Sequence, residues 1–449
     1  MKFGLESEKH LFNLTKNKPS GGVFSFIDAL SDYNRFFGKD VTSRVTNEFV
    51  LNMVEIGTLP SSDPMEIIQD YLLNLMLIQT VSIREDVALV PLAALPMDFL
   101  PHMIPKWPYY VQNSILSNRK QDSWNMENSS PLKRAGNCAG IHVHVELETA
   151  PEFLFSNREL QDKFNMGLMM TPMIAFGSSP YFFDKHEASS MRGLSYYNGV
   201  YADEKLNGGL PPVMASSAEV LEYFQTGINT WIDRGVALGF PREELSQLTG
   251  KKGANWNPVR WNRAWNTIEI RCLDSDSIDL DAAKFIWMTG AMNRLDTKGE
   301  NFTCRVIDAR EDLSETVIDQ CFSIEGSEVL ILSSKHIADL FNRAITAGVR
   351  DELVERYLNR LHDFAVARAP KRHYWAYEHL LTVLRNHETS SERILAYTNR
   401  CGTLTATQGI TIVHSAIKEQ KKSLRIMQNA FPDVFERLKV SHPELSLHH

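Results

Sequence analysis

The sequence predicts an α+β fold, in which a strand-rich core is followed by a helical C-terminal region. Short segments of the first 300 residues alternate apolar and polar residues, as in residues 141–148 (IHVHVELE), and this is the pattern of a half-buried strand. From about Ser334 onward, apolar residues recur at helical spacing instead. We therefore expect a core over residues 1–333 and a helical region over residues 334–449 that packs on it.

The first elements are predicted from local signals. Residues 1–60 read as short strands and turns. A helix is expected to begin after Asp63, because Asp63 is a good N-cap, Pro64 suits the first helical position and Glu66 follows three residues after the cap. Residues 85–135 and 176–215 are rich in Pro, Asn, Ser, Gly and Tyr, which predicts long loop-bearing regions.

The remaining elements follow from hydrophobic periodicity. Strands are expected over 139–148 and 266–274, and the loop GKKG over 250–253. Helices are expected over 158–173, 218–239, 279–295, 336–349, 351–369, 374–386 and 410–438.

Composition excludes several classes of protein. The 449 residues are 43% hydrophobic and 23% charged, which is ordinary for a globular protein, and the net charge of -8 argues against nucleic-acid binding. The five cysteines are scattered without a CxxC pair, so neither a disulfide framework nor a zinc ribbon is indicated. The N-terminus lacks the apolar core of a signal peptide, and no apolar run is long enough to span a membrane. We expect a cytoplasmic protein without a membrane partner.

Several strand-like segments carry carboxylates or histidines on the face opposite their apolar residues. These positions are Glu6 and Glu8 in the opening strand, Glu48 and Glu55 in NEFVLNMVE, His142, His144 and Glu146 in IHVHVELE, and Glu269 with Arg271 in TIEIRC. If the segments share one sheet, the carboxylates form a bowl-shaped cluster. Their negative charges repel one another, and a hard divalent cation relieves this repulsion. Carboxylate oxygens with one or two imidazoles suit Mg²⁺ or Mn²⁺. Because Mg²⁺ in such sites is usually completed by substrate phosphates, the bowl suggests a nucleotide.

Each segment alone also fits a simpler interpretation. The glutamates of the opening strand and of residues 47–55 fit solvated faces, and Glu269 with Arg271 fits a cross-strand ion pair. A His-x-His strand also occurs in metal-dependent hydrolases. The combination of segments, in this order, favours a single site.

Four segments resemble motifs of the carboxylate-amine ligases of the glutamate-cysteine ligase 2 type, relatives of glutamine synthetase. In family order they are FGLESEKHL, NEFVLNMVEIGTLP, AGIHVHVELE and WNTIEIRCLDS, and they span residues 1 to roughly 300. The resemblance implies an antiparallel sheet that forms a funnel with flanking helices. It also implies that ATP enters at one end and that a substrate carboxylate becomes an acyl phosphate, which an amine attacks to form an amide, with a γ-glutamyl bond as the first expectation.

The resemblance also implies roles for individual residues. The Mg²⁺ ligands would be Glu6, Glu8, Glu48, Glu55, His142 and Glu269. Arg271 would stabilise phosphate or acyl-phosphate oxygens, Arg260 falls where the family places another basic residue, and His144 would be a second ligand or a phosphate donor. The substrates would be an amino acid or other small carboxylate and an amine, and a homo-oligomer is compatible with the sequence.

Two departures from the family pattern concern the substrate. Glu146 stands where the family usually has a small residue, and its carboxylate could bind a cationic amine or a further metal, or it could turn out of the pocket. The serine-proline segment survives at residues 178–181 but continues differently, and Arg192 in that continuation could pair with a substrate carboxylate. Two other functions stay open: a metal-dependent hydrolase that uses His142 and His144, and a nucleotide-binding relative without turnover.

Overall fold

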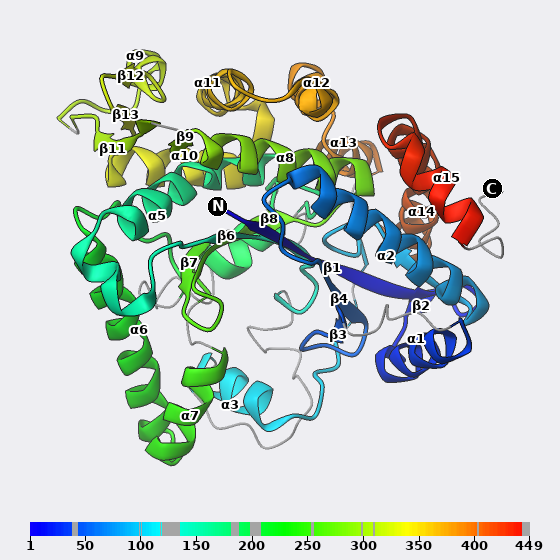
Figure 1. Cartoon of the computed structure of the whole chain (residues 1–449). Coiled ribbons are helices and arrows are strands. Elements are labelled where there is room, and N and C mark those ends of the chain that lie inside the picture. Colours follow the sequence, from blue (N-terminus) through cyan, green and yellow to red (C-terminus); the bar gives the residue numbers. More distant parts are fainter. Residues whose placement is uncertain are drawn as a thin grey trace.

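An antiparallel sheet crosses the middle of the molecule (Figure 1). The computed structural model describes residues 1–37, 44–97, 99, 101–116, 118, 135–180, 188–197, 208–252, 256–297, 300–308, 310–401 and 404–441. The main strand order is β3-β4-β1-β6-β8-β7, and β2 and β5 also pair with β1. The strands of this sheet are β1 (Phe3–Asn13), β2 (Lys18–Pro19), β3 (Val45–Asn47), β4 (Met53–Gly57), β5 (Val87–Val90), β6 (Gly140–Glu146), β7 (Val259–Asn262) and β8 (Thr267–Asp274). The predicted α+β class with an antiparallel sheet is therefore confirmed.

One face of the sheet is apolar and packs on helices. Leu5 of β1, Val143 of β6 and Ile270 of β8 are buried on this face because their strands alternate. The helices of this side include α2 (Pro64–Arg84), α5 (Glu159–Met169) and α8 (Ile278–Asn293). Polar side chains reach across as well: the Tyr71 hydroxyl of α2 donates to Asp281 of α8 at 3.1 Å. The opposite face of the same strands carries their polar side chains.

Helix α8 is buried on nearly every side. It lies between the sheet and the outer helices α11 (Glu352–Val366) and α12 (Tyr374–Asn386), as Figure 1 shows. Ten of its sixteen residues belong to a hydrophobic cluster that runs from the sheet into the C-terminal helices. The C-terminal helices thus share a hydrophobic core with the sheet. The expected division of the chain at residue 334 remains a prediction.

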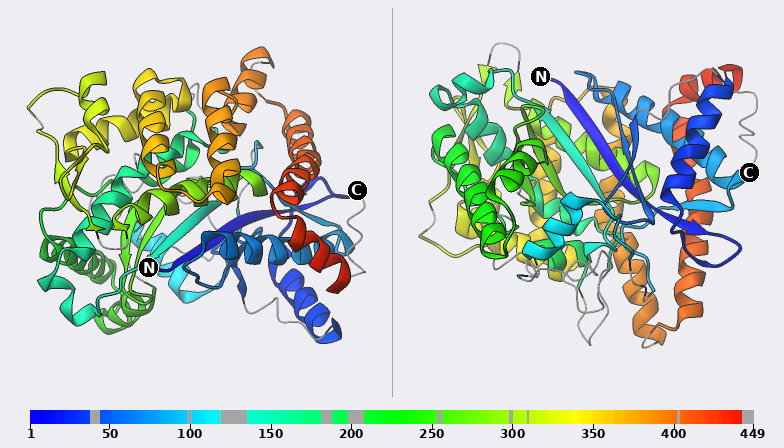
Figure 2. Two further views of the ribbon diagram at one scale, coloured as in Figure 1. Left: turned by 45° about the horizontal axis from the view of Figure 1, so that its top comes forward. Right: turned by 90° about the horizontal axis from the view of Figure 1, so that it is seen from below.

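The outer helices complete the fold. They are α1 (Val23–Phe37), α3 (Trp107–Leu116), α6 (Ser217–Ala237), α7 (Arg242–Lys252), α9 (Glu315–Gln320), α10 (Ser334–Thr346), α13 (Ser390–Cys401), α14 (Ala406–Ala430) and α15 (Pro432–Ser441). Short strands form two small sheets: β9 (Asp296–Thr297) with β10 (Glu300–Asn301), and β11 (Thr303–Val306), β12 (Ile324–Glu325) and β13 (Glu328–Ile331). Both views of Figure 2 place α14 and α15 beside the N-terminal segments, and α15 contacts α2. None of the helices described is long and apolar enough to cross a membrane.

Some predicted elements are wrong. Residues 1–60 contain the helix α1, whose buried Val23, Phe26 and Leu30 repeat at helical spacing. The segment 47–55 is two strands with a turn between them, and residues 250–252 belong to α7 instead of a loop. The expected helix 410–438 breaks before Pro432, because proline cannot continue a helix hydrogen-bond ladder. Parts of the expected loop regions 85–135 and 176–215 lie outside the described residues.

An ion pair joins the start of α8 to α12. Asp279 accepts a hydrogen bond from His379 at 2.9 Å and one from the Ser277 hydroxyl at 2.6 Å. Burial alone would raise the pKa of Asp279, but these hydrogen bonds outweigh it and lower the pKa from 3.8 to about 2. Since the folded carboxylate holds its proton less tightly than the unfolded one, the pair stabilises the fold above pH about 4. This stabilisation is lost as the pH falls toward 2.

We therefore expect Asp279→Asn to lower the free energy of unfolding at pH 7 by about 2 kcal/mol, at about 1.4 kcal/mol per pKa unit. Urea unfolding at pH 7 and pH 3 measures this difference, which should shrink at the lower pH. The matched control is Asp308→Asn, because exposed Asp308 also pairs with an arginine (Arg310) and should matter little. Unchanged stability of Asp279→Asn at pH 7 would contradict the assignment.

Candidate active site: a carboxylate cluster on the open face of the sheet

The open face of the sheet gathers acidic and histidine side chains from neighbouring strands. The antiparallel register sets Glu6 of β1 opposite His142 of β6, and Glu8 of β1 opposite Glu55 of β4. Further along, His144 of β6 lies opposite Glu269 of β8, and Glu269 lies opposite Arg260 of β7. Directly opposed residues on one face have neighbouring side chains. Five strands therefore supply one continuous polar cluster.

Glu48 joins this cluster through the turn between β3 and β4. Two residues seven apart on one straight strand would point to opposite faces. The chain reverses between Asn47 and Met53 instead, so Glu48 and Glu55 come together, and both line the same cavity. The Glu48 carboxylate accepts a hydrogen bond from the backbone N–H of Phe49 at 2.7 Å.

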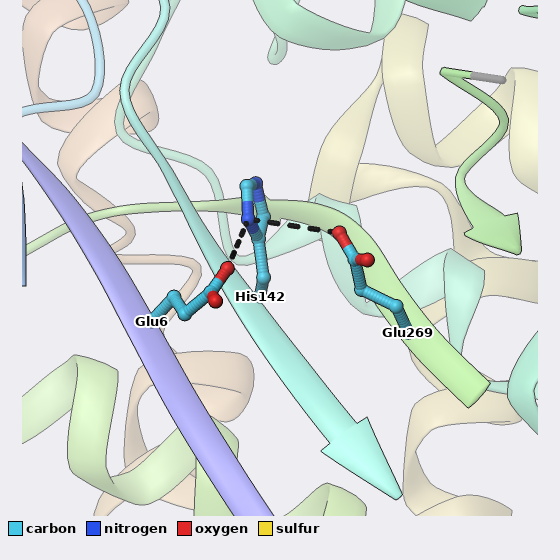
Figure 3. Close-up of side chains that lie close together, drawn as sticks. All are labelled: Glu6, His142 and Glu269. Carbon is cyan, nitrogen blue, oxygen red and sulfur yellow. Dashed lines mark hydrogen bonds and ion pairs between the residues drawn. The ribbon is translucent and has the colours of Figure 1, made fainter. Parts of the chain in front are cut away.

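Two groups of side chains within the cluster have the spacing of a metal site. They are Glu6, His142 and Glu269, and Glu8, Glu55 and His142, and in each group one ligand atom per residue lies within 4.8 Å of the others. Figure 3 shows the carboxylates of Glu6 and Glu269 directed at the His142 imidazole from both sides. Its Nδ1 lies 3.3 Å from Glu6 and 3.9 Å from Glu269, and its Nε2 lies 3.5 Å from Glu8.

The β3–β4–β1 side of the cluster holds an excess of negative charge. Burial raises the pKa of Glu8, Glu48 and Glu55, and the charges of neighbouring glutamates raise the pKa of Glu48 and Glu55 further. The shift is large for Glu55, which faces the charges of Glu6, Glu48 and Glu8. Carboxylates brought together in this way are stabilised by a cation among them.

The β8–β7 side is balanced by arginines. The Glu269 carboxylate accepts hydrogen bonds from Arg260 Nε at 2.8 Å, Asn262 Nδ2 at 2.8 Å and Arg271 Nη1 at 3.2 Å. Burial would raise the pKa of Glu269, but the two guanidinium groups outweigh it and hold the pKa well below its usual range. Asn262 was not singled out by the sequence, although it stands two residues after Arg260 on the same face.

The two histidines differ in their surroundings. Burial and the nearby Arg271 lower the pKa of His142 to about 4, so its imidazole is neutral and can act as a ligand. His144 bonds the Thr267 hydroxyl at 3.0 Å and lies 3.3 Å from Glu6. Burial would lower the pKa of His144, but its interaction with Glu6 outweighs burial and raises it.

A cavity of about 530 Å³ opens over this cluster. One wall is the sheet, with Glu6, Glu48, Glu55, His142, Arg260, Glu269 and Arg271. The facing wall comes from α6, whose lining residues are mostly apolar, and from α7, which supplies Ser246 and Thr249. The β7–β8 turn with exposed Trp265 forms a third side. Residues of the α6 wall are Leu221, Phe224, Gln225, Ile228, Asn229 and Ile232. A volume of this size accommodates a small-molecule substrate or cofactor.

Arg192 lies behind the cluster and is fully buried. Its guanidinium donates to the carbonyl oxygens of Arg271 at 3.0 Å and Cys138 at 3.3 Å, and it lies 3.5 Å from the Glu8 carboxylate and 3.2 Å from His142 Nε2. The group sits directly against Gly140, where an added Cβ would lie 2.4 Å from Arg192 Cζ. Arg192 therefore contacts two cluster residues from inside the protein, and it is not among the residues that line the cavity.

Glu146 is placed apart from the cluster. Its carboxylate accepts a hydrogen bond from the backbone N–H of Lys2 at 2.9 Å, and it does not line the cavity. The structure thus brings together eight of the predicted site residues on the open face, and His144 lies beside Glu6. The two other predicted residues lie elsewhere: Arg192 is buried beneath the cluster, and Glu146 lies at the end of its strand.

Comparison with known proteins identifies the family. The glutamate-cysteine ligase family 2 (GCS2) model matches residues 2–299. A glutamate–cysteine ligase from Francisella tularensis, solved in complex with AMP, is 14% identical; the match covers 100% of this chain and 95% of that one, with a TM-score of 0.54. A bifunctional glutathione synthetase from Pasteurella multocida is 14% identical over 93% of this chain, with a TM-score of 0.46, and this chain spans 52% of its length.

No curated protein sequence matches significantly. The likeness to the Francisella enzyme extends over the whole chain and concerns the fold. The family match covers the segments that carry the cluster, from β1 to β8. The chain therefore belongs to the glutamate-cysteine ligase family 2, and it falls in the class of ATP-dependent carboxylate–amine ligases.

Proposed function

We propose that the chain uses ATP and Mg²⁺ to join the carboxylate of an amino acid, glutamate first, to an amine, with an acyl phosphate as intermediate. The observation that carries this proposal is the convergence of five carboxylates and His142 on one face of the sheet, beside two arginines and over one cavity. Family membership supports the bond type. The AMP bound to the Francisella enzyme of the same fold supports the nucleotide.

The residues present fit a magnesium site. The donor atoms are carboxylate oxygens with one neutral imidazole, which hard divalent cations prefer over thiolate-seeking metals. The raised pKa values of Glu8, Glu48 and Glu55 mark a place where positive charge is missing among the protein groups themselves. Glu6, Glu8, Glu48, Glu55, His142 and Glu269 would hold the ions, with Mn²⁺ as an alternative. Bound there, Mg²⁺ supplies positive charge that neutralises the phosphate oxygens during transfer.

The arginines would act on the transferred group. Arg271 and Arg260 are fixed by Glu269, so their guanidinium groups are oriented before any substrate arrives. In the first step, a substrate carboxylate oxygen would attack the γ-phosphorus and ADP would leave. In the second, an amine would attack the acyl carbon and phosphate would leave. Oriented guanidinium groups stabilise the charge on phosphate oxygens in both steps. The apolar α6 wall would exclude water from the acyl phosphate.

A hydroxamate assay tests this function. Purified protein is incubated with Mg²⁺, ATP, hydroxylamine and each member of a panel of amino acids and small carboxylic acids. Hydroxylamine traps an acyl phosphate whichever amine is natural, so we expect a hydroxamate that depends on ATP and on one carboxylate. Reactions without ATP, and with EDTA, are the controls.

The same assay separates the two alternative functions. A metal-dependent hydrolase that uses His142 and His144 would act without nucleotide, so an ATP requirement excludes it. A relative without turnover would bind ATP and form no hydroxamate with any carboxylate. That outcome would replace our proposal.

A further inference from the structure

We propose that Asp274 and Ser179 are positioning residues for the carboxylate cluster and that they act through Arg192. Neither residue reaches the cavity: Asp274 is 1% exposed, Ser179 is fully buried, and neither belongs to the residues that line the cavity. The two residues hold the backbone of Arg192, whereas its guanidinium contacts the cluster. The proposal rests on the proposed function, because it concerns the side chains to which we assign the metal.

The Asp274 carboxylate stands at the end of β8 and fixes the 178–179 segment. Its Oδ2 atom accepts a hydrogen bond from the Ser179 hydroxyl at 2.6 Å and one from the backbone N–H of Ser178 at 2.9 Å. Two buried cations in its neighbourhood, Lys284 and Arg192, form their ion pairs with other carboxylates. Asp274 therefore acts on this segment as a hydrogen-bond acceptor.

The Ser179 side chain connects Asp274 to the backbone of Arg192. A hydroxyl group has one hydrogen to donate and two lone pairs that accept. Because the hydrogen of Ser179 is donated to Asp274, its Oγ is oriented as an acceptor toward the backbone N–H of Arg192, 3.4 Å away. The Ser179 carbonyl also accepts from the backbone N–H of Met191 at 2.5 Å, and Ser179 forms a β-bridge with Ser190.

The Arg192 side chain extends from this fixed backbone to the cluster. One nitrogen of its guanidinium lies 3.5 Å from the Glu8 carboxylate, and another lies 3.2 Å from Nε2 of His142. His142 belongs to both groups of side chains with the spacing of a metal site, and Glu8 belongs to one of them. Loss of a residue that orients metal ligands from outside typically lowers metal affinity or activity by about 10- to 100-fold.

Two neighbouring serines give a matched pair of variants. Both are fully buried, and the Ser178 hydroxyl also makes two hydrogen bonds, to the Ser275 carbonyl at 2.5 Å and from the Ala93 N–H at 2.9 Å. Each alanine variant therefore removes one buried hydroxyl with two partners, but only Ser179→Ala breaks the connection to Arg192. We expect Ser179→Ala to weaken Mn²⁺ binding about tenfold or more. Ser178→Ala should bind Mn²⁺ like wild type.

Mn²⁺ titration of the whole protein without ATP, followed by electron paramagnetic resonance of the free ion, measures this binding. Thermal unfolding of both variants shows how much stability each hydroxyl contributes. If the hydrogen bonds of Ser179 served stability alone, the two variants would bind Mn²⁺ equally well, and this result would overturn the proposal.

Rescue by a conservative variant tests Asp274. Asp274→Asn keeps an oxygen that can accept both hydrogen bonds, so Mn²⁺ binding should stay close to that of wild type, whereas Asp274→Leu should weaken it about tenfold or more. Asp162→Leu is the control for stability, because it also removes a buried carboxylate that accepts a backbone N–H, that of Cys304 at 2.9 Å, and it lies outside the cavity lining. Equal loss of binding in Asp274→Leu and Asp162→Leu would contradict a positioning role.

A double variant tests whether the effect passes through Arg192. Arg192→Met removes the guanidinium, so the further change Ser179→Ala should weaken Mn²⁺ binding no more than Arg192→Met does alone. Effects that add fully in the double variant would show that Ser179 acts on the cluster by another route.

A readout without metal separates this proposal from the proposed function. The ring resonances of His142 in the metal-free protein, assigned by their loss in His142→Gln, should shift in Ser179→Ala and stay in place in Ser178→Ala. A wild type that neither binds Mn²⁺ nor forms a hydroxamate would overturn the proposed function. Ring resonances that stay in place in Ser179→Ala would overturn the positioning role.

Discussion

Replacing Glu6 by Gln is expected to lower ATP-dependent hydroxamate formation by roughly a hundredfold or more while the protein stays folded. Removal of a group that stabilises transition-state charge typically has an effect of this size. Glu6 lies 3.3 Å from both His142 and His144, and its pKa is lowered by hydrogen bonds to the two imidazoles despite its burial. Its side chain is 29% exposed, so Gln can be accommodated without a buried unpaired charge. Activity, far-UV circular dichroism and Mn²⁺ binding by titration measure the three consequences.

The matched control is Glu146→Gln. Glu146 is on the same strand face as His142 but bonds Lys2 outside the cavity, so we expect this variant to keep its activity. A marked loss with one class of amine would instead support the role in amine binding that the sequence suggested for Glu146. Near-normal turnover of Glu6→Gln, with Mn²⁺ binding intact, would show that Glu6 does not hold the metal.

Adding a single methyl group at Gly140 is expected to be almost as damaging as removing a ligand. The Cβ of Gly140→Ala would lie 2.4 Å from the Arg192 guanidinium, which cannot move without losing its contacts to Glu8, His142 and the Arg271 carbonyl. Overpacking of this kind destabilises by about 1–3 kcal/mol. A displacement of about 1 Å in a catalytic arrangement lowers the rate roughly a hundredfold. Thermal unfolding and the hydroxamate assay measure both effects.

The neighbouring strand offers a control for this substitution. Gly4→Ala on β1 would place its Cβ 3.6 Å from the His144 Cβ, an ordinary contact, so we expect near-normal activity. In the double variant Gly140→Ala with Arg192→Met, the effects should not add, because the clash disappears with the guanidinium. If Gly140→Ala behaved like Gly4→Ala, Arg192 would not be the group that positions Glu8 and His142.

The sequence was informative where a side chain's position follows from its own strand. Alternation alone assigned Glu6, His142 and Glu269 to the polar faces of their strands, and the antiparallel register then brought those faces together. Alternation gave the wrong arrangement where the chain reverses its direction within a segment. Glu48 and Glu55 appeared as two ends of one segment, and the turn that unites them has no strong Gly or Pro signal.

Contacts between residues far apart in the sequence could not be predicted, for a different reason. The depth of Arg192 depends on Gly140, 52 positions earlier, which leaves space for a guanidinium beside the cluster. No local sequence pattern encodes such a pairing. Arg192 stands in a segment with the composition of a loop, so the sequence suggested that it contacts the substrate. The apolar α6 wall was predicted as a helix, but nothing in its periodicity says which cavity one of its faces covers.

The burial of α8 on nearly every side has a consequence for how the chain folds. A helix with such a surface has no stable place in water, so it needs the sheet on one side and α11 and α12 on the other at the same time. Strand β8, which carries Glu269 and Arg271, leads directly into this helix. Because both the strands of the site and the C-terminal helices pack on α8, we expect them to unfold together. The division of the chain near residue 334 stays a prediction.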